Sequence, residues 1–161
     1  MKAHPVLLLL LLCAPLGRGL EVGEKAPPFA NPDRTNRHVL SRDYLGKGWL
    51  IVDFFATDCE GCKKELPILE RLSRDFQTTG LKVLVFATDS EGQSLVEPYF
   101  RQYPTTLTVL LDRYQTTVKR YGVSEIPSLF LIDPAGNVVY REVGFKEELY
   151  ELVQAALVAK R

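Results

Sequence analysis

One stretch of sequence decides the fold: Trp49-Leu-Ile-Val-Asp-Phe-Phe-Ala-Thr-Asp-Cys59-Glu-Gly-Cys62-Lys-Lys-Glu-Leu-Pro67. Its first eight residues are almost all apolar or aromatic, which predicts a strand buried on both faces. Beyond them, apolar residues recur at steps of three and four and predict an amphipathic helix: Cys62, Leu66, Leu69, Leu72 and Phe76. We expect Pro67 to kink this helix. Cys59 and Cys62 therefore stand at the junction of a strand and a helix.

The position of the two cysteines favours reversible redox chemistry. A helix start carries partial positive charge and unpaired N–H groups, and both favour a thiolate. A zinc site needs two further ligands, and beyond residue 19 the chain offers only one other histidine or cysteine, His38. A structural disulfide is the other alternative, but its loop is too short to constrain the unfolded chain much. We expect Cys59 to attack as nucleophile and the shielded Cys62 to resolve the mixed disulfide.

Two acids near the cysteines are candidates for proton transfer. Asp53 lies inside the apolar strand, where burial would raise its pKa and allow proton exchange near neutrality. The alternative for Asp53 is an acid at a sheet edge paired with a cation. Glu65 lies one helical turn beyond Cys62 and is either a second catalytic acid or a surface glutamate. Lys63 and Lys64 either stabilise the thiolate or form a solvated helix face.

Length and composition indicate one globular domain. The chain has 161 residues, of which 46% are hydrophobic, and it contains no internal repeat or long linker. Its 20 basic residues balance 20 acidic ones, and no basic run is interleaved with aromatic residues. We therefore expect no nucleic-acid binding.

Residues 1–19 have the build of a secretory signal peptide. Lys2 provides a basic start, Val6–Leu12 an apolar run, and Leu16–Gly19 small residues before a cut after residue 19. The run is much shorter than the ~20 residues that span a bilayer. A lipid anchor at Cys13 is an alternative that the large leucine before it disfavours. We expect a soluble protein exported to the periplasm or another extracytoplasmic compartment, where thiols can be oxidised.

The rest of the pattern predicts an α/β sandwich with a mixed sheet. Residues 20–37 read as an irregular N-terminal lead-in, and Pro134–Asn137 as the tight turn of a hairpin. Taken alone, Ile126-Pro127 reads as an ordinary proline at the start of a strand. The expected strands are 81–88, 106–111, 128–133 and 138–143, and the expected helices are 91–103, 116–121 and a closing segment around Leu149 to Leu157.

The active-site segment resembles that of thioredoxin-fold proteins, and most closely the exported thiol–disulfide oxidoreductases of the TlpA/ResA type. The resemblance extends to Gly23–Phe29, to Leu45–Phe54 and to Tyr121–Asp133. It implies a thioredoxin-like sandwich over residues 20–161, with a central mixed β-sheet flanked by helices and an N-terminal extension.

The same resemblance implies roles for individual residues. Pro127 corresponds to the cis-proline that faces the dithiol, and Asp53 to the buried acid of thioredoxins. Glu65 corresponds to the glutamate that takes part in cysteine titration and substrate binding. Gly144 corresponds to the loop glycine beside the substrate groove, to which Ile126 also contributes.

The resemblance further implies an exported reductant of protein disulfides. Such proteins commonly act on the haem-binding cysteines of apocytochrome c and are recharged by a membrane electron carrier, with no organic or metal cofactor. The chain departs from the family pattern in having Asp58 in place of an aromatic residue and Gly61 in place of a proline. We expect the acid at position 58 to destabilise the thiolate of Cys59. Thr57 lies only two residues before Cys59, and this spacing argues against a peroxidase.

Two other classes of function remain open from the sequence. One is a redox-inactive, chaperone-like module that grips unfolded chains through the same groove. The other is a metallochaperone that holds Cu(I) on the two thiolates, since soft ligands select that ion. The only methionine is Met1, and no His-rich tract supports copper binding.

Overall fold

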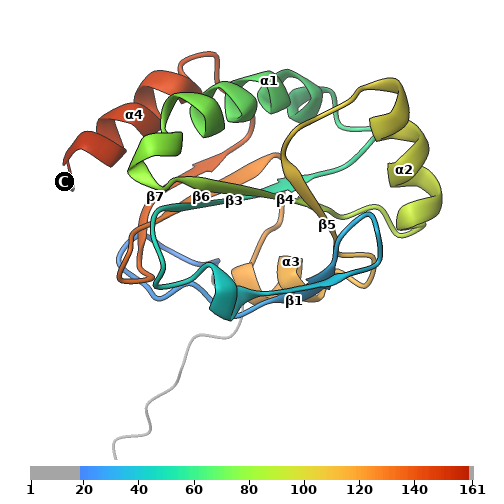
Figure 1. The fold of residues 1–161 in the computed structure, drawn as a ribbon, viewed down its shortest axis with the longest axis horizontal. Helices are drawn as coiled ribbons and strands as arrows, with labels where there is room; N and C mark the ends of the chain where they lie inside the picture. Colours follow the sequence, from blue (N-terminus) through green and yellow to red (C-terminus); the bar gives the residue numbers. More distant parts are fainter. Residues whose placement is uncertain (1–18, 160–161) are drawn as a thin grey trace, which may run out of the picture.

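The computed structural model describes residues 19–159, which are built around a five-stranded sheet (Figure 1). The strand order is β5-β4-β3-β6-β7. β3 and β5 both run parallel to β4, whereas β6 runs antiparallel to β3 and to β7. The predicted mixed sheet is therefore confirmed. The strands are β3 (Leu50–Phe55), β4 (Lys82–Ala87), β5 (Thr108–Leu111), β6 (Ser128–Ile132) and β7 (Val138–Val143).

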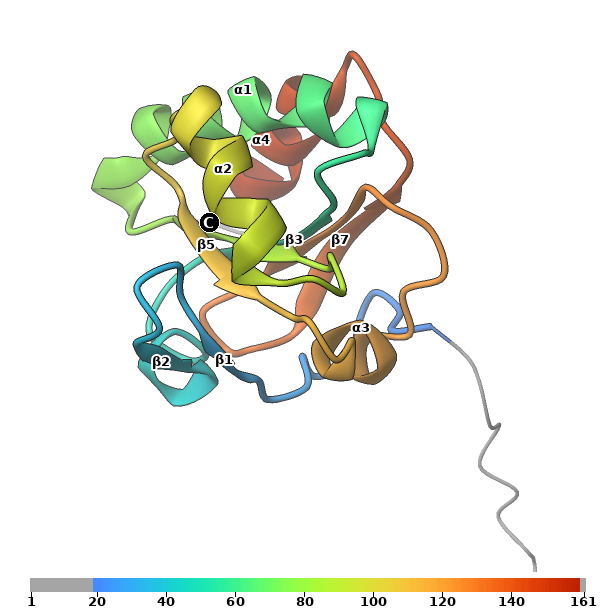
Figure 2. The same cartoon turned by 90° about the vertical axis from the view of Figure 1, so that its right-hand side faces the viewer.

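Helices cover both faces of this sheet, as Figure 2 shows edge-on. Three helices pack on one face: α1 (Glu60–Asp75), α2 (Gln93–Gln102) and α4 (Leu149–Ala159). The opposite face is covered by α3 (Thr116–Tyr121) and by the N-terminal extension. These helices match the sequence expectations, and α1 and α2 run unbroken through Pro67 and Pro98.

The central strand β3 explains how the two layers are held apart. All six of its residues are buried, and successive side chains point to opposite faces. Ile51 and Phe55 pack under α1, whereas Val52 and Phe54 pack over α3 and the extension. Asp53 shares the face of Ile51 and Phe55, so the strand points its one acid at the active-site helix.

The expectation of an irregular lead-in over residues 20–37 is wrong in part. β1 (Ala30–Pro32) pairs with β2 (His38–Leu40) in a small antiparallel ribbon. Three residues that include a proline give no strand signal of their own. The pairing is supported by Asn31, whose side chain is buried and hydrogen-bonds to residues far along the chain. The stabilising contacts are non-local, so no local pattern could announce them.

The leader lies almost entirely outside the described residues. The expected signal peptide over residues 1–19 and the lipidation candidate Cys13 both fall there, with Gly19 alone described. Between residues 19 and 159, no helix is long and apolar enough to cross a membrane.

Candidate active site

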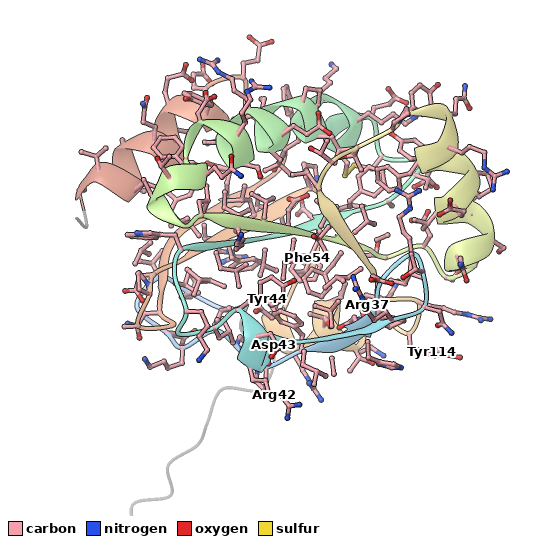
Figure 3. The ribbon with its side chains drawn as sticks, viewed as in Figure 1. Arg37, Arg42, Asp43, Tyr44, Phe54 and Tyr114 are labelled. Carbon is pink, nitrogen blue, oxygen red and sulfur yellow. A yellow bond between two sulfur atoms is a disulfide. The ribbon has the colours of Figure 1, made fainter. Side chains whose placement is uncertain are left out.

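Cys59 and Cys62 form a disulfide at the start of α1, with an S–S distance of 2.12 Å (Figure 3). Cys59 is the N-cap of the helix, and the backbone N–H of Cys62 donates to its sulfur at 3.1 Å. Cys59 is partly exposed, whereas Cys62 is 1% exposed. A thiolate at position 59 would accept a hydrogen bond from this N–H and would be stabilised by the partial positive charge at the start of the helix. Cys62, in contrast, lies where an attacking protein cannot reach it.

Asp89, which the sequence analysis missed, fixes the loop that leads to Cys59. Its carboxylate accepts hydrogen bonds from the Thr57 hydroxyl at 2.6 Å and the Thr57 backbone N–H at 3.1 Å. Asp89 follows β4, the parallel neighbour of β3, and the carboxyl ends of parallel strands share one sheet edge. An acid directly after a buried strand was the sequence signal that could have revealed it.

The loop of Pro127 approaches the helix start at Gly61, which lies between the two cysteines. The Ile126–Pro127 peptide bond is cis, as the family resemblance implies and contrary to the reading from the residues alone. The backbone N–H of Gly144 donates to the Pro127 carbonyl at 2.8 Å, and Gly144 has a φ of 79°, a conformation that favours glycine. Three of the expected site residues, Ile126, Pro127 and Gly144, are therefore brought together, with Pro127 buried and the other two partly exposed.

Gly61, between the two cysteines, permits a close approach to this loop. A Cβ at position 61 would lie 3.2 Å from the Pro127 ring and 3.2 Å from Phe145. Phe145 also lies below the ammonium of Lys64, 5.9 Å from the ring centre. The chain thus places an aromatic side chain beside the dithiol from the segment after β7. Sequence spacing from the cysteines could not have revealed Phe145.

Asp53 and Glu65 are brought together beneath the cysteines. They are 1% and 2% exposed, so the alternatives of an edge acid and a surface glutamate are wrong. Burial raises the pKa of Asp53 well above its usual range, and the charge of Glu65 and the hydrogen bond between the two carboxyls act in the same direction. Burial also raises the pKa of Glu65 to about 7, although this hydrogen bond opposes it. The two groups form one titrating unit that keeps a proton at neutral pH.

The two lysines differ in their surroundings. Lys63 forms an ion pair with Glu60 at 2.6 Å, and both side chains are at the surface. Lys64 is exposed and contributes the cation over Phe145. Of the two interpretations of Lys63 and Lys64, these contacts agree with the solvated helix face.

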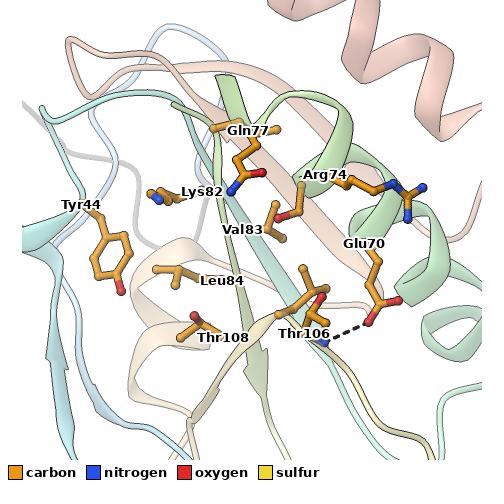
Figure 4. Close-up of a pocket in the computed structure, with 12 residues that line it drawn as sticks. Tyr44, Glu70, Arg74, Gln77, Lys82, Val83, Leu84, Thr106 and Thr108 are labelled. Atoms are coloured by element: carbon orange, nitrogen blue, oxygen red, sulfur yellow. Dashed lines mark hydrogen bonds between the residues drawn. The ribbon is translucent and has the colours of Figure 1, made fainter. Parts of the chain in front are cut away.

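Two hollows lie beside α1. One of about 590 Å³ lies between the end of α1 and the starts of β4 and β5 (Figure 4), where Thr106 donates to Glu70 at 3.2 Å. It is at the opposite end of the parallel strands from Cys59. A second, of about 660 Å³, runs beside the first turns of α1 and includes Lys63, Tyr99 and Tyr103. Within residues 19–159, no group of three or more His, Cys, Asp or Glu side chains is placed to hold a metal ion.

Comparisons with known proteins agree with this geometry. Residues 22–141 match the model of the AhpC/TSA family. The chain is 30% identical to the thiol–disulfide oxidoreductase ResA of Bacillus thuringiensis subsp. konkukian over 92% of each chain. It is 31% identical to ResA of Bacillus subtilis, over 83% of this chain and 79% of that one.

A solved structure from Chlorobium tepidum, described as a putative thiol:disulfide interchange protein DsbE, is also similar. It superposes with a TM-score of 0.81 at 30% identity, covering 88% of this chain and 98% of that one. A disulfide at a helix start, above a buried carboxyl pair and beside a cis-proline, is thus set in a fold shared with disulfide-exchange proteins.

Proposed function

Since the chain belongs to the AhpC/TSA family and is a thiol–disulfide oxidoreductase similar to ResA and DsbE, we propose that it is an exported reductant of protein disulfides. The observation that carries the proposal is the placement of Cys59 and Cys62. The first is partly exposed and accepts a hydrogen bond from one backbone N–H, that of Cys62, and the second is shielded above two buried carboxyls. This arrangement separates the attacking sulfur from the resolving one.

The proposed reaction has two steps that conserve electrons and protons. The Cys59 thiolate attacks one sulfur of a substrate disulfide, whose other sulfur leaves as a thiolate. Cys62 then transfers its proton to the Asp53–Glu65 pair and attacks the Cys59 sulfur. The bond between Cys59 and the substrate breaks, and the second substrate sulfur leaves. Two electrons have passed to the substrate, and the enzyme ends as the Cys59–Cys62 disulfide.

The remaining site residues serve substrate docking in this proposal. Next to Pro127, an extended segment of substrate would pair with the backbone of Ile126, and Gly144 would leave room for it. A membrane protein that supplies electrons would restore the dithiol, and apocytochrome c is one candidate substrate outside the cytoplasm. The proposed processed protein is residues 20–161, with no lipid at Cys13.

Trapping of a mixed disulfide tests the proposal. In Cys62→Ser the first step proceeds but the resolving sulfur is missing, so a substrate stays bonded to Cys59. We expect this variant to accumulate dithiothreitol-sensitive adducts with exported proteins. Cys59→Ser is the matched control and should form none, although it keeps the same groove.

The two alternatives predict different results. A chaperone-like module would hold its clients equally well in Cys59→Ser, and those complexes would resist dithiothreitol. A Cu(I) carrier would bind stoichiometric copper after anaerobic reconstitution of the reduced protein and would lose it in both cysteine variants. Either result in place of trapping would contradict the proposal.

A further inference from the structure

A row of side chains crosses the sheet from the buried acid to the edge strand. Asp53 on β3 is paired with Leu129 on β6, and Leu129 is paired with Glu142 on β7. Directly paired residues on neighbouring strands point to the same face. Glu142 therefore lies on the face of Asp53, under α1, and Tyr140 shares it two residues earlier. Neither β7 residue was a candidate from the sequence.

Glu142 is held as a carboxylate on this face. The Tyr140 hydroxyl donates to it at 2.6 Å, and the Lys146 ammonium lies 3.2 Å away. Its side chain is only 14% exposed. Burial alone would raise the pKa of Glu142, but the hydrogen bonds from Tyr140 and Lys146 outweigh burial, and the pKa lies below its usual value.

Few other titratable groups surround Glu65. Asp53 faces it from β3, and Tyr140 and Glu142 interact with it from β7. β6 contributes the apolar Leu129 between them. α4 buries only apolar side chains: Leu149, Val153 and Leu157. Within α1, the sulfur of Cys62 lies one turn before Glu65 and is bonded to Cys59. Among the carboxyl groups described around Glu65 within residues 19–159, Glu142 is thus the one that is held ionised while the Asp53–Glu65 pair keeps a proton.

We propose that Glu142 is a positioning residue that acts through Glu65: its fixed negative charge keeps a proton on the buried carboxyl pair while the cysteines are oxidised. When the Cys59–Cys62 disulfide is reduced, Cys62 emerges as a buried thiolate and takes up this proton. Glu142 therefore sets the pH range over which the dithiol is restored. This inference rests on the proposed function, and it adds a residue that does not touch the sulfurs.

The electrostatics agree with the geometry. The charge of Glu142 raises the pKa of Glu65 in the same direction as burial. A like charge disfavours ionisation of its neighbour most strongly where water is excluded. Tyr140 and Lys146 make the effect persistent, because they keep Glu142 ionised when Glu65 is protonated.

Titration of Glu65 by carboxyl ¹³C NMR tests the inference in the oxidised protein. Its signal is identified by its loss in Glu65→Gln. Glu142→Gln removes the charge and keeps an acceptor for Tyr140, and it should move the Glu65 midpoint to lower pH by about half a unit or more. Glu147→Gln is the matched control, because it removes the same charge from an exposed position two residues before α4.

A second readout connects the titration to the reaction. The rate at which dithiothreitol reduces the Cys59–Cys62 disulfide should show a pH profile that moves to lower pH in Glu142→Gln and not in Glu147→Gln. An unchanged Glu65 midpoint, or equal shifts in both variants, would overturn the inference. So would a shifted midpoint with an unshifted rate profile. Failure of the proposed function would appear differently, as absence of trapped adducts with the Glu65 titration unaffected.

Discussion

Asp53 and Glu65 share a hydrogen bond in the core, and within residues 19–159 neither carboxyl forms an ion pair with a cation. An ionised carboxylate in an apolar interior is costly unless it is paired, so such groups take up protons instead. The pair therefore stores a proton a short way beneath the cysteines. Asp53 could be found from sequence because it interrupts an apolar run. Glu65 stayed ambiguous, since helical spacing placed it one turn from Cys62 without showing what lay opposite.

The stored proton should make stability depend on pH. The folded-state pKa of Glu65 lies above its unfolded value, so the folded protein binds more protons between about pH 4 and pH 7. The stabilisation is fully present below this range and is lost as the pH rises through it. The free energy of unfolding of the oxidised protein is measured with urea at both ends of this pH range. Its decrease from the lower to the higher pH should be smaller by ~2 kcal/mol in Glu65→Gln. A slope unchanged from the original protein would contradict the assignment, and Glu147→Gln should retain the original slope.

At the scale of elements, the corner between β3 and α1 is held from a neighbouring strand. Asp89 follows β4 and binds both the hydroxyl and the N–H of Thr57. On the other side, Gly61 allows the first turn of α1 to approach Pro127. The corner itself is evident from sequence, because an apolar run changes there to a helical period. Its supports come from residues 32 and 66 positions away along the chain. An acid after a buried strand singles out Asp89, but no local pattern pairs Asp89 with Thr57 or Pro127 with Gly61.

Loss of the Asp89 side chain should loosen this corner. Asp89→Ala leaves the partly buried N–H and hydroxyl of Thr57 without their acceptor, at an expected cost of about 1–3 kcal/mol in the free energy of unfolding. Asp89→Asn keeps one acceptor and should cost less. Chemical denaturation of the oxidised protein measures both, with Ser90→Ala as the exposed control. Equal stability of Asp89→Ala and Ser90→Ala would show that the corner does not depend on this bond.

At the scale of the whole molecule, the N-terminal extension completes the layer below the sheet. Phe29 and Val39 join the core beneath β3, and Asn31 connects β1 to the end of β5 and to α3. The order of strands and helices from residue 49 onward follows from periodicity and turn signals, and the structure confirms it. The ribbon of β1 and β2 could not be predicted from the sequence, because three-residue strands have too few positions to show alternation. The position of Glu142 depends on a register that shifts between Leu131 and Ile132, which sequence does not fix.

The extension should therefore contribute to global stability. Asn31→Ala removes side-chain bonds to the Leu111 carbonyl, to Asp112 and to Thr117, all of them buried. We expect a loss of about 2 kcal/mol or more, with one cooperative transition in thermal unfolding. His38→Ala, on the exposed side of β2, is the control. A separate early transition for residues 19–40 would instead mean that the extension is an appended unit.

The reduction potential of the Cys59–Cys62 pair tests the central claim most directly. The purified protein is equilibrated with defined thiol–disulfide buffers, and the state of the two cysteines is followed by mass tagging. We expect full, reversible conversion with a potential near about −250 mV or below, as suits a reductant fed by another protein. A potential near about −120 mV would make the protein a disulfide donor, and a pair that never cycles would contradict the account altogether.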